Sequence, residues 1–144
     1  MAKYIKTSLQ INASKELIWK ILTDFDRYPE WNPFIKSLSG KVETGNQITV
    51  KLNNMVFKPT ILKYEKNSEF KWLGHLGLKG LFDGEHKFHL KTNTDGSTTL
   101  EQSEKFTGIL IHLFPKKMYE DTKQSFIQMN DELKLRAERV KKAT

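Results

Sequence analysis

The sequence predicts an α+β fold in which a curved antiparallel sheet of six to seven strands wraps around a long C-terminal helix, with short helices after the first strand. Three observations predict it. One amphipathic helical segment follows the first strand, six segments of strand character come next, and residues 115–140 show the apolar spacing of a helix. An antiparallel sheet needs a cover for one face, and only the C-terminal segment is long enough to provide it.

The first strand and the first helix are predicted within residues 4–25. Residues 4–11, YIKTSLQI, alternate apolar and polar side chains, as does a strand with one buried face. Ser14 is a suitable N-cap for a helix over residues 15–25, KELIWKILTDF, whose apolar side chains share one face. Pro29 and Pro33 in DRYPEWNPF then predict a helix stop and a turn, because proline lacks an amide donor and restricts the preceding residue.

Strand signals dominate the middle of the chain. Residues 35–42 and 47–52 predict a hairpin around ETGN, and residues 56–64, VFKPTILKY, predict an edge strand or a bulge because of Pro59. The remaining strands are predicted at residues 70–76, 85–92 and 97–108. The segments GLKGLF and YPEWNPF are expected to form either a movable rim of a pocket or plain loops.

The C-terminal helix is predicted from apolar residues that recur at steps of three and four after Pro115, which suits the first turn of a helix. About 25 residues in a helix span ~40 Å, enough to cross the sheet. The shared face consists of Met118, Thr122, Phe126, Met129, Leu133, Ala137 and Val140.

Length and composition favour one soluble domain over residues 1–144. The sequence has no cysteine, which excludes disulfides, thiolate metal ligands and cysteine nucleophiles and fits a reducing compartment. It shows neither an apolar signal segment nor a run that approaches the ~18 apolar residues of a membrane span. We therefore expect a cytoplasmic protein without stable membrane insertion.

The net charge of +7 allows two interpretations. A basic chain suits a nucleic-acid or anionic-membrane partner, but it is also typical of a lysine-rich solvated surface. The lysines are scattered along the whole chain, and the densest group, KLRAERVKKA, is interleaved with glutamate. This pattern favours the solvated surface, so we expect no nucleic-acid partner.

The last hairpin predicts a polar cluster on an apolar face. Its loop TDG, residues 94–96, suits a type I turn followed by a left-handed glycine. The resulting register sets His86 opposite Glu104, and Phe88 opposite Gln102, with side chains about 5 Å apart at Cβ. A slip by one residue would expose the apolar set, which argues against it.

Two roles remain open for the cluster of His86, Gln102 and Glu104. It can present hydrogen-bonding groups to a mostly apolar ligand, or it can be a self-satisfied pair that braces the structure. His86 and Glu104 are also the candidate catalytic residues, as an acid–base pair next to a ketone. His89 points to the opposite face, and His75 and His112 are isolated in sequence, so no metal site is expected.

Aromatic and methionine residues are the second candidate feature, as walls of a ligand cavity or as plain core. The candidate ligand-binding residues are Trp31, Phe34, Phe57, Trp72, Phe82, His86, Phe88, Gln102, Glu104, Phe106, Met118, Phe126 and Met129. Sequence motifs for a nucleophile elbow, a phosphate loop, a zinc protease or a dinucleotide fold are missing, so no cofactor is expected.

Several strings resemble the START-like superfamily, also called SRPBCC or helix-grip, and within it the polyketide cyclase/dehydrase branch. These strings are LTDFDRYPEWNPFI, FDGEHKFHL with EQSEKFTGIL, and FIQMNDELKLRAERV. The resemblance runs nearly from end to end and implies a helix-grip fold with a ligand cavity between the sheet and the C-terminal helix. It does not specify a ligand, because the superfamily carries lipids, sterols, hormones and polyketides and also includes cyclases.

The leading hypothesis is binding or carriage of a hydrophobic small molecule, such as a lipid, a polyketide or an aromatic metabolite. The alternative is a cyclase or dehydratase that uses His86 and Glu104, and an enzyme is the less favoured of the two. A third hypothesis is a protein-interaction module that uses the groove beside the long helix, and the protein partner stays open.

Overall fold

The computed structural model describes residues 2–144. Along the chain the elements are β1 (Lys3–Ile11), α1 (Lys15–Leu22), the 3₁₀ helix η1 (Phe25–Glu30), β2 (Ser37–Ser39), β3 (Thr49–Lys51), β4 (Val56–Phe57), β5 (Thr60–Glu65), β6 (Glu69–His75), β7 (Asp83–Thr92), β8 (Thr98–Thr107) and α2 (Lys116–Ala143). The α+β class and the large antiparallel sheet with a long C-terminal helix are confirmed.

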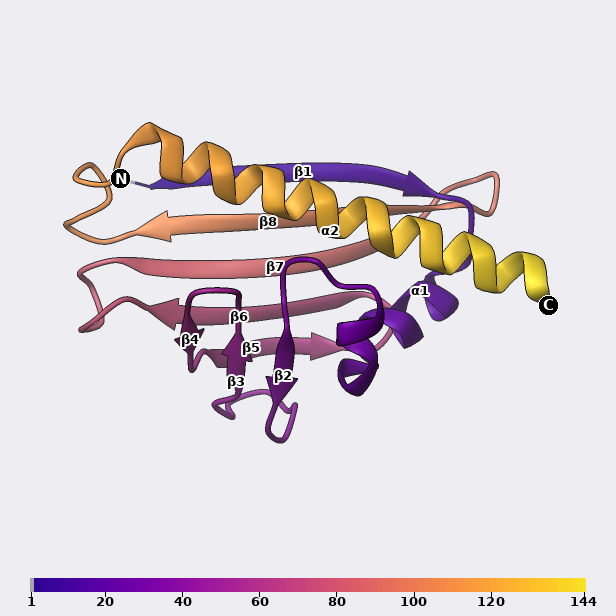
Figure 1. The fold of residues 1–144 in the computed structure, drawn as a ribbon, viewed down its shortest axis with the longest axis horizontal. Coiled ribbons are helices and arrows are strands. Elements are labelled where there is room, and N and C mark those ends of the chain that lie inside the picture. The colour runs from indigo at the N-terminus through magenta and orange to yellow at the C-terminus, as the bar shows by residue number, and fades with distance from the viewer. Residues whose placement is uncertain (1) are drawn as a thin grey trace.

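The strands form two sheets rather than one sheet of six to seven. Five strands pair in the order β1-β8-β7-β6-β5, and three short strands pair in the order β2-β3-β4. Figure 1 shows α2 running obliquely across the large sheet, while the small sheet crosses in front of β5, β6 and β7. Helix α2 and the small sheet thus cover the same face of the large sheet.

The division between the sheets falls inside a segment that was expected to be one strand, residues 56–64. Pro59 separates β4 from β5 because it has no amide donor for a strand ladder. A single bridge between Gln47 and Thr60 links the two sheets within residues 2–144.

The register predicted for the last hairpin is confirmed. His86 pairs with Glu104 and Phe88 with Gln102 across β7 and β8. The amide of Asn93 donates to the carbonyl of Ser97 (2.8 Å), and Gly96 has the left-handed φ of +88° that the turn requires.

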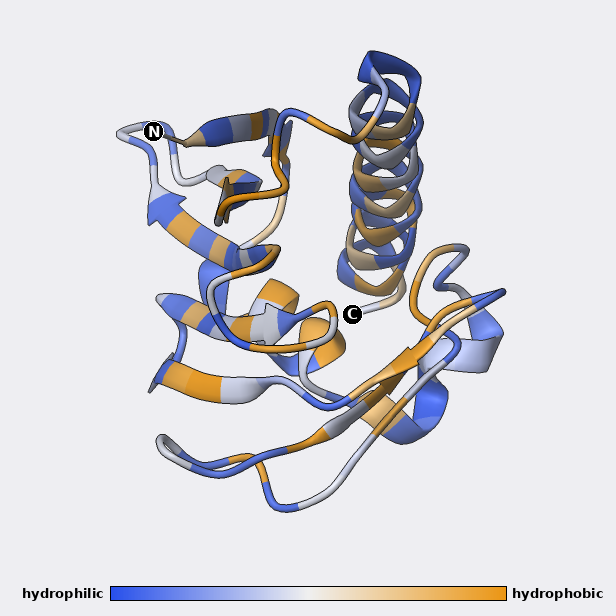
Figure 2. Ribbon diagram, turned by 90° about the vertical axis from the view of Figure 1, so that its left-hand side faces the viewer, coloured by the Kyte–Doolittle hydropathy of each residue, from blue (hydrophilic) through white to orange (hydrophobic). Residues whose placement is uncertain are grey.

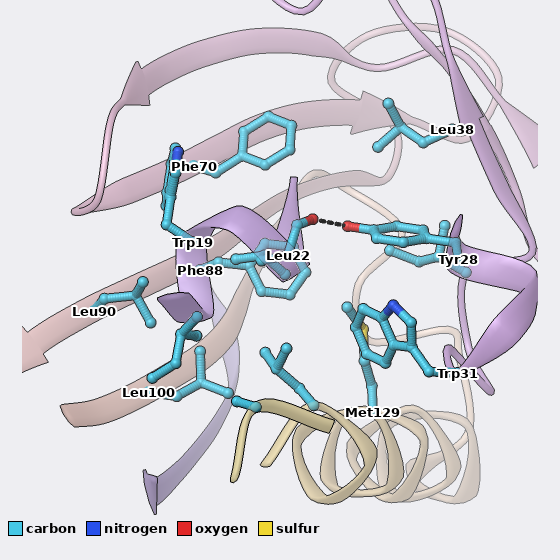
Figure 3. Close-up of a cluster of buried hydrophobic side chains, with 14 of the residues drawn as sticks. Trp19, Leu22, Tyr28, Trp31, Leu38, Phe70, Phe88, Leu90, Leu100 and Met129 are labelled. Atoms are coloured by element: carbon cyan, nitrogen blue, oxygen red, sulfur yellow. Dashed lines mark hydrogen bonds between the residues drawn. The ribbon is translucent and has the colours of Figure 1, made fainter. Parts of the chain in front are cut away.

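Helix α1 begins as predicted and ends earlier than residue 25. The hydroxyl of Ser14 accepts the amide of Leu17 (3.2 Å), as an N-cap does. At the other end, Thr23 donates to the carbonyl of Trp19 (2.7 Å), and the hydroxyl of Tyr28 donates to the carbonyl of Leu22 (Figure 3). Because side chains satisfy these carbonyls, the chain can leave the helix and enter η1.

The interior contains two apolar clusters that share α2. The larger lies between α1, η1, the sheets and the later turns of α2, where Met129, Leu133 and Ala137 are fully buried. The smaller includes Phe82 and Phe106 and packs against Met118 and other residues near the first turns of α2. The later turns of α2 therefore close the main core, and its first turns lie beside the second cluster.

No helix within residues 2–144 has the length and apolar character needed to cross a membrane.

Candidate functional site

A cavity of about 750 Å³ lies beside the smaller cluster. Its wall is formed by the inner faces of β6, β7 and β8, by the hairpin of β3 and β4, by the β6–β7 loop and by the first turns of α2. Its volume falls within the range of about 300–1,000 Å³ that small-molecule sites occupy.

Eight of the predicted ligand-binding residues lie together in this wall. They are Phe34, Phe57, Trp72, Phe82, His86, Glu104, Phe106 and Met118. Phe34 reaches the wall because the side-chain oxygen of Asn32 accepts the amides of Phe34 (2.9 Å) and Ile35 (2.8 Å), which fixes the turn after η1.

The other five predicted residues lie outside the wall. Trp31, Phe88 and Met129 belong to the larger core cluster, as Figure 3 shows. Phe126 is fully buried below the ring of His86, at 4.7 Å between ring centroids. Gln102 is also fully buried, and its side-chain oxygen lies 3.0 Å from Nε2 of His86. None of the five lines the cavity.

The prediction missed several wall residues on loops, on short strands and on α2. Met55 and Val56 come from the hairpin of β3 and β4, Phe114 precedes α2, and Thr122 lies on α2. The helix face predicted from Met118 to Val140 includes Thr122, which was the available signal. In the hairpin only Phe57 was predicted, because strands of two and three residues are too short to show alternation.

His86 is enclosed by rings on the cavity wall. Only 3% of it is exposed, and its ring lies nearly parallel to that of Trp72 at 4.8 Å and to that of Phe34 at 6.4 Å. Phe126 contacts it edge-on. Both ring nitrogens of its side chain have polar partners among the described residues.

The two ring nitrogens of His86 contact different strand positions of β8. Nδ1 lies 3.3 Å from Oε1 of Glu104, and Nε2 lies 3.0 Å from Oε1 of Gln102. The side-chain amide of Gln102 donates to Oδ1 of Asn130 on α2 (2.7 Å), and the amide of Asn130 donates to the hydroxyl of Thr7 on β1 (2.8 Å). A hydrogen-bonded chain of side chains thus runs from the cavity wall through Asn130 on α2 to Thr7 on β1.

Glu104 fits into the wall because the neighbouring position has no side chain. A Cβ atom at Gly84 would lie 2.1 Å from Oε2 of Glu104. Gly74, paired with Gly84 across β6 and β7, also lines the cavity. Gly84 leaves room for the carboxylate, whereas a Cβ atom at Gly74 would meet the ring of Phe57.

His75 has a partner, contrary to the expectation that it is isolated. Its Nδ1 lies 2.7 Å from Oδ1 of Asp83, and both oxygens of Asp83 accept the amide of Gly80 (3.1 Å each). The β6–β7 register places His75 opposite Asp83, but the long loop over residues 76–82 does not fix a register as the short turn of the last hairpin does. This contact ties the β6–β7 loop to the cavity wall.

Exposed apolar side chains lie on the two loops that adjoin the cavity wall at Gly77 and Phe114. Leu78 on the β6–β7 loop is 75% exposed, and Ile109 and Leu113 before α2 are each 76% exposed. The two loops are joined because the amide of Ile109 donates to the carbonyl of Gly80 (3.1 Å). Figure 2 views this end of the molecule and shows hydrophobic colouring in the segment that leads into α2.

The segment before α2 is held by Tyr119. Its hydroxyl donates to the carbonyl of Ile111 (2.6 Å), and burial raises the pKa of this phenol, which keeps it a neutral donor. Within residues 2–144, no three or more metal-ligating side chains gather at one place.

Comparison with known proteins agrees with this architecture. Residues 4–138 match the sequence model of a family described as polyketide cyclase/dehydrase and lipid transport. A search of curated protein sequences found no match.

Several solved structures share the fold. A START superfamily protein from Mycobacterium smegmatis superposes with a TM-score of 0.73 at 21% identity over 95% of this chain and 98% of that chain. A hypothetical protein from Helicobacter pylori gives 0.79 at 10% identity over 94% and 88%. CalU16 from Micromonospora echinospora gives 0.69 at 20% identity over 93% and 73%. At these identities the likeness concerns the fold alone.

Proposed function

The chain belongs to the polyketide cyclase/dehydrase and lipid transport family, and we propose that it binds or carries a hydrophobic small molecule in its cavity. Lipids, polyketides and aromatic metabolites are the candidate ligands. We treat residues 1–144 as one ligand-binding domain that acts in the cytoplasm, in line with its lack of cysteine.

One observation carries the proposal: a cavity of about 750 Å³ whose wall is mostly aromatic and aliphatic, with few polar groups. Burial of apolar ligand surface contributes roughly 25 cal/mol per Å², before the costs of association. The exposed leucine and isoleucine side chains on the loops beside the cavity wall suit the passage of an apolar molecule.

Native mass spectrometry of the freshly purified protein tests this proposal. We expect a co-purifying ligand of low molecular mass that is released on denaturation. Thr122→Phe is expected to fill the cavity and to lower ligand occupancy, because Thr122 lies in the wall. Ser125→Phe is the control: its hydroxyl also bonds to a helix carbonyl, but it lies outside the wall. Equal occupancy in both variants would contradict the proposal.

A cyclase or dehydratase is the second candidate function, supported by the position of His86 and Glu104. Both line the cavity, and their facing atoms are 3.3 Å apart, within reach of a shared proton. Such a pair can remove a proton from the carbon next to a ketone.

Isotope exchange tests the second candidate. An aryl ketone labelled with deuterium next to its carbonyl is expected to lose the label in the presence of the protein, as followed by NMR. His86→Ala is expected to abolish this exchange while circular dichroism shows an intact fold. Exchange at the same rate in this variant would contradict the enzymatic role.

A further inference from the structure

The hydrogen-bonded side chains behind the cavity run from His86 through Gln102 and Asn130 to Thr7. Thr7 determines which group donates at each contact. The hydroxyl of Thr7 donates its only proton to the backbone carbonyl of Gln102 (2.6 Å). The same hydroxyl therefore accepts from the side-chain amide of Asn130, 2.8 Å away. The opposite orientation of Asn130 would place an amide oxygen against a hydroxyl oxygen that has no proton left.

The orientation of the Asn130 amide determines that of Gln102, which in turn determines the proton position on His86. Since the amide group of Asn130 faces Thr7, its oxygen accepts from Nε2 of Gln102 (2.7 Å). The oxygen of Gln102 then faces Nε2 of His86 (3.0 Å), so that nitrogen must carry a proton. Gln102 is fully buried, and its Nε2 also donates to the backbone carbonyl of Phe126 (3.4 Å), which requires the same orientation of its amide.

One proton must also lie between His86 and Glu104. Without it, lone pairs of Nδ1 and Oε1 would face each other across 3.3 Å. The proton resides either on the imidazole, giving an ion pair, or on Oε1, giving a neutral acid. In both states the pair has no net charge, and Oε2 of Glu104 is a hydrogen-bond acceptor only.

Oε2 is the atom of this pair that a ligand can reach. It lies over Gly84, and both residues line the cavity. Among residues 2–144 no donor contacts Oε2, and it is not one of the fully enclosed polar atoms that lack a partner. The deep wall of the cavity therefore offers a ligand one unused acceptor.

We propose that the buried end of the ligand is a neutral hydroxyl or N–H group that donates to Oε2 of Glu104, and that a carboxylate is excluded from this place. This inference rests on the proposed ligand-binding function and specifies the ligand class. Gln102, Asn130 and Thr7 act as positioning residues, because they decide that the cavity receives an acceptor.

Three rigid probes with the same ring system test the inference: naphthalene, 2-naphthol and 2-naphthoate, with binding measured by fluorescence titration. We expect 2-naphthol to bind about tenfold more tightly than naphthalene, the size of one buried hydrogen bond to a charged or polar group. We expect 2-naphthoate to bind more weakly than both.

Two variants of Glu104 test whether the preference for naphthol depends on the hydrogen-bond acceptor that the hydrogen-bonded side chains present, or only on a polar group at this position. Glu104→Leu removes the acceptor and is expected to abolish the preference for naphthol. In Glu104→Gln, the new amide donates to Nδ1 of His86 and presents its oxygen to the cavity, so the preference is expected to persist. Ser125→Ala, which removes a hydroxyl of α2 outside the wall, is expected to leave it unchanged.

The outcomes are distinguishable. If no probe binds, the proposed function fails and the inference falls with it. If naphthalene and 2-naphthol bind equally well, or if Glu104→Gln reverses the preference toward naphthoate, the inference alone is overturned.

Discussion

Nδ1 of His86 and Oε1 of Glu104 lie 3.3 Å apart because the two residues occupy directly opposed positions of β7 and β8. The turn at residues 94–96 sets this opposition, since the length of a hairpin loop determines which residues pair. A one-residue slip would move His86 to the outer face of the sheet. The position of His86 and Glu104 in the cavity wall thus depends on a turn at the far end of the hairpin.

Replacement of His86 by alanine is expected to lower both ligand affinity and Tm. It leaves the oxygen of Gln102 without its donor and removes a packed ring, at a cost of about 2–4 kcal/mol in the free energy of unfolding. Thermal denaturation and probe titration measure the two effects. His89→Ala, on the opposite face of β7, is the control. A lower Tm with unchanged affinity would mean that the pair is structural.

Replacement of Gly84 by alanine is expected to lower the affinity for a hydroxyl-bearing probe about tenfold with little change in fold. The new Cβ would lie 2.1 Å from Oε2 of Glu104 and must displace the carboxylate, which sits at the end of a flexible side chain. Gly74→Ala is the matched control, because its Cβ would meet a ring carbon of Phe57 at an ordinary 3.4 Å. Equal affinities in both variants would contradict the assigned place of Oε2.

Thr7→Val and Asn130→Ala are each expected to lower the free energy of unfolding. The double variant is expected to lose less than the sum of the two single losses. Each single change leaves a buried partner unsatisfied, which costs about 1–3 kcal/mol. We expect a coupling energy of about 1 kcal/mol in urea denaturation, as for residues of one hydrogen-bonded network. If the two changes in the free energy of unfolding add strictly, Thr7 and Asn130 do not belong to one coupled hydrogen-bonded network.

Acid is expected to remove a stabilising contact between α2 and the turn that joins β1 to α1. The amide of Asn12 (2.8 Å) and then the ammonium group of Lys134 (2.9 Å) donate to Glu138 and hold the pKa of this carboxyl below its ordinary value. The contribution is present above the ordinary pKa and is lost as pH falls through the lowered one. Glu138→Gln should therefore destabilise at pH 7 and have little effect near pH 3, as measured by urea denaturation.

Glu132→Gln, on the exposed side of the same helix, serves as the control for that titration. If Glu138→Gln has the same effect at both pH values, the ionised carboxylate is not the stabilising species.

The parts of the fold that were predictable have strong local determinants. The loop at residues 94–96 determined the register of the last hairpin, and the spacing after Pro115 determined α2. Pro59 indicated an irregularity, but sequence alone did not reveal that the chain changes sheets there. That change depends on packing between distant segments, which leaves no periodic signal.

Core and cavity residues were harder to separate. Phe88 and His86 are two positions apart on the same face of β7, yet Phe88 packs in the main core and His86 lines the cavity. Alternation gives the face of a strand and says nothing about the position along it where other elements pack. That position is decided by α1 and η1, which fill only one end of the space under α2.

The two ends of helix α2 serve different purposes. Its first turns line the cavity with Met118 and Thr122. Its later turns are buried in the core through Met129, Leu133 and Ala137. Mutations that reshape ligand preference therefore arise at positions distinct from those that carry folding stability. A lineage with this architecture can explore new ligands at one end of a helix while natural selection preserves the other end.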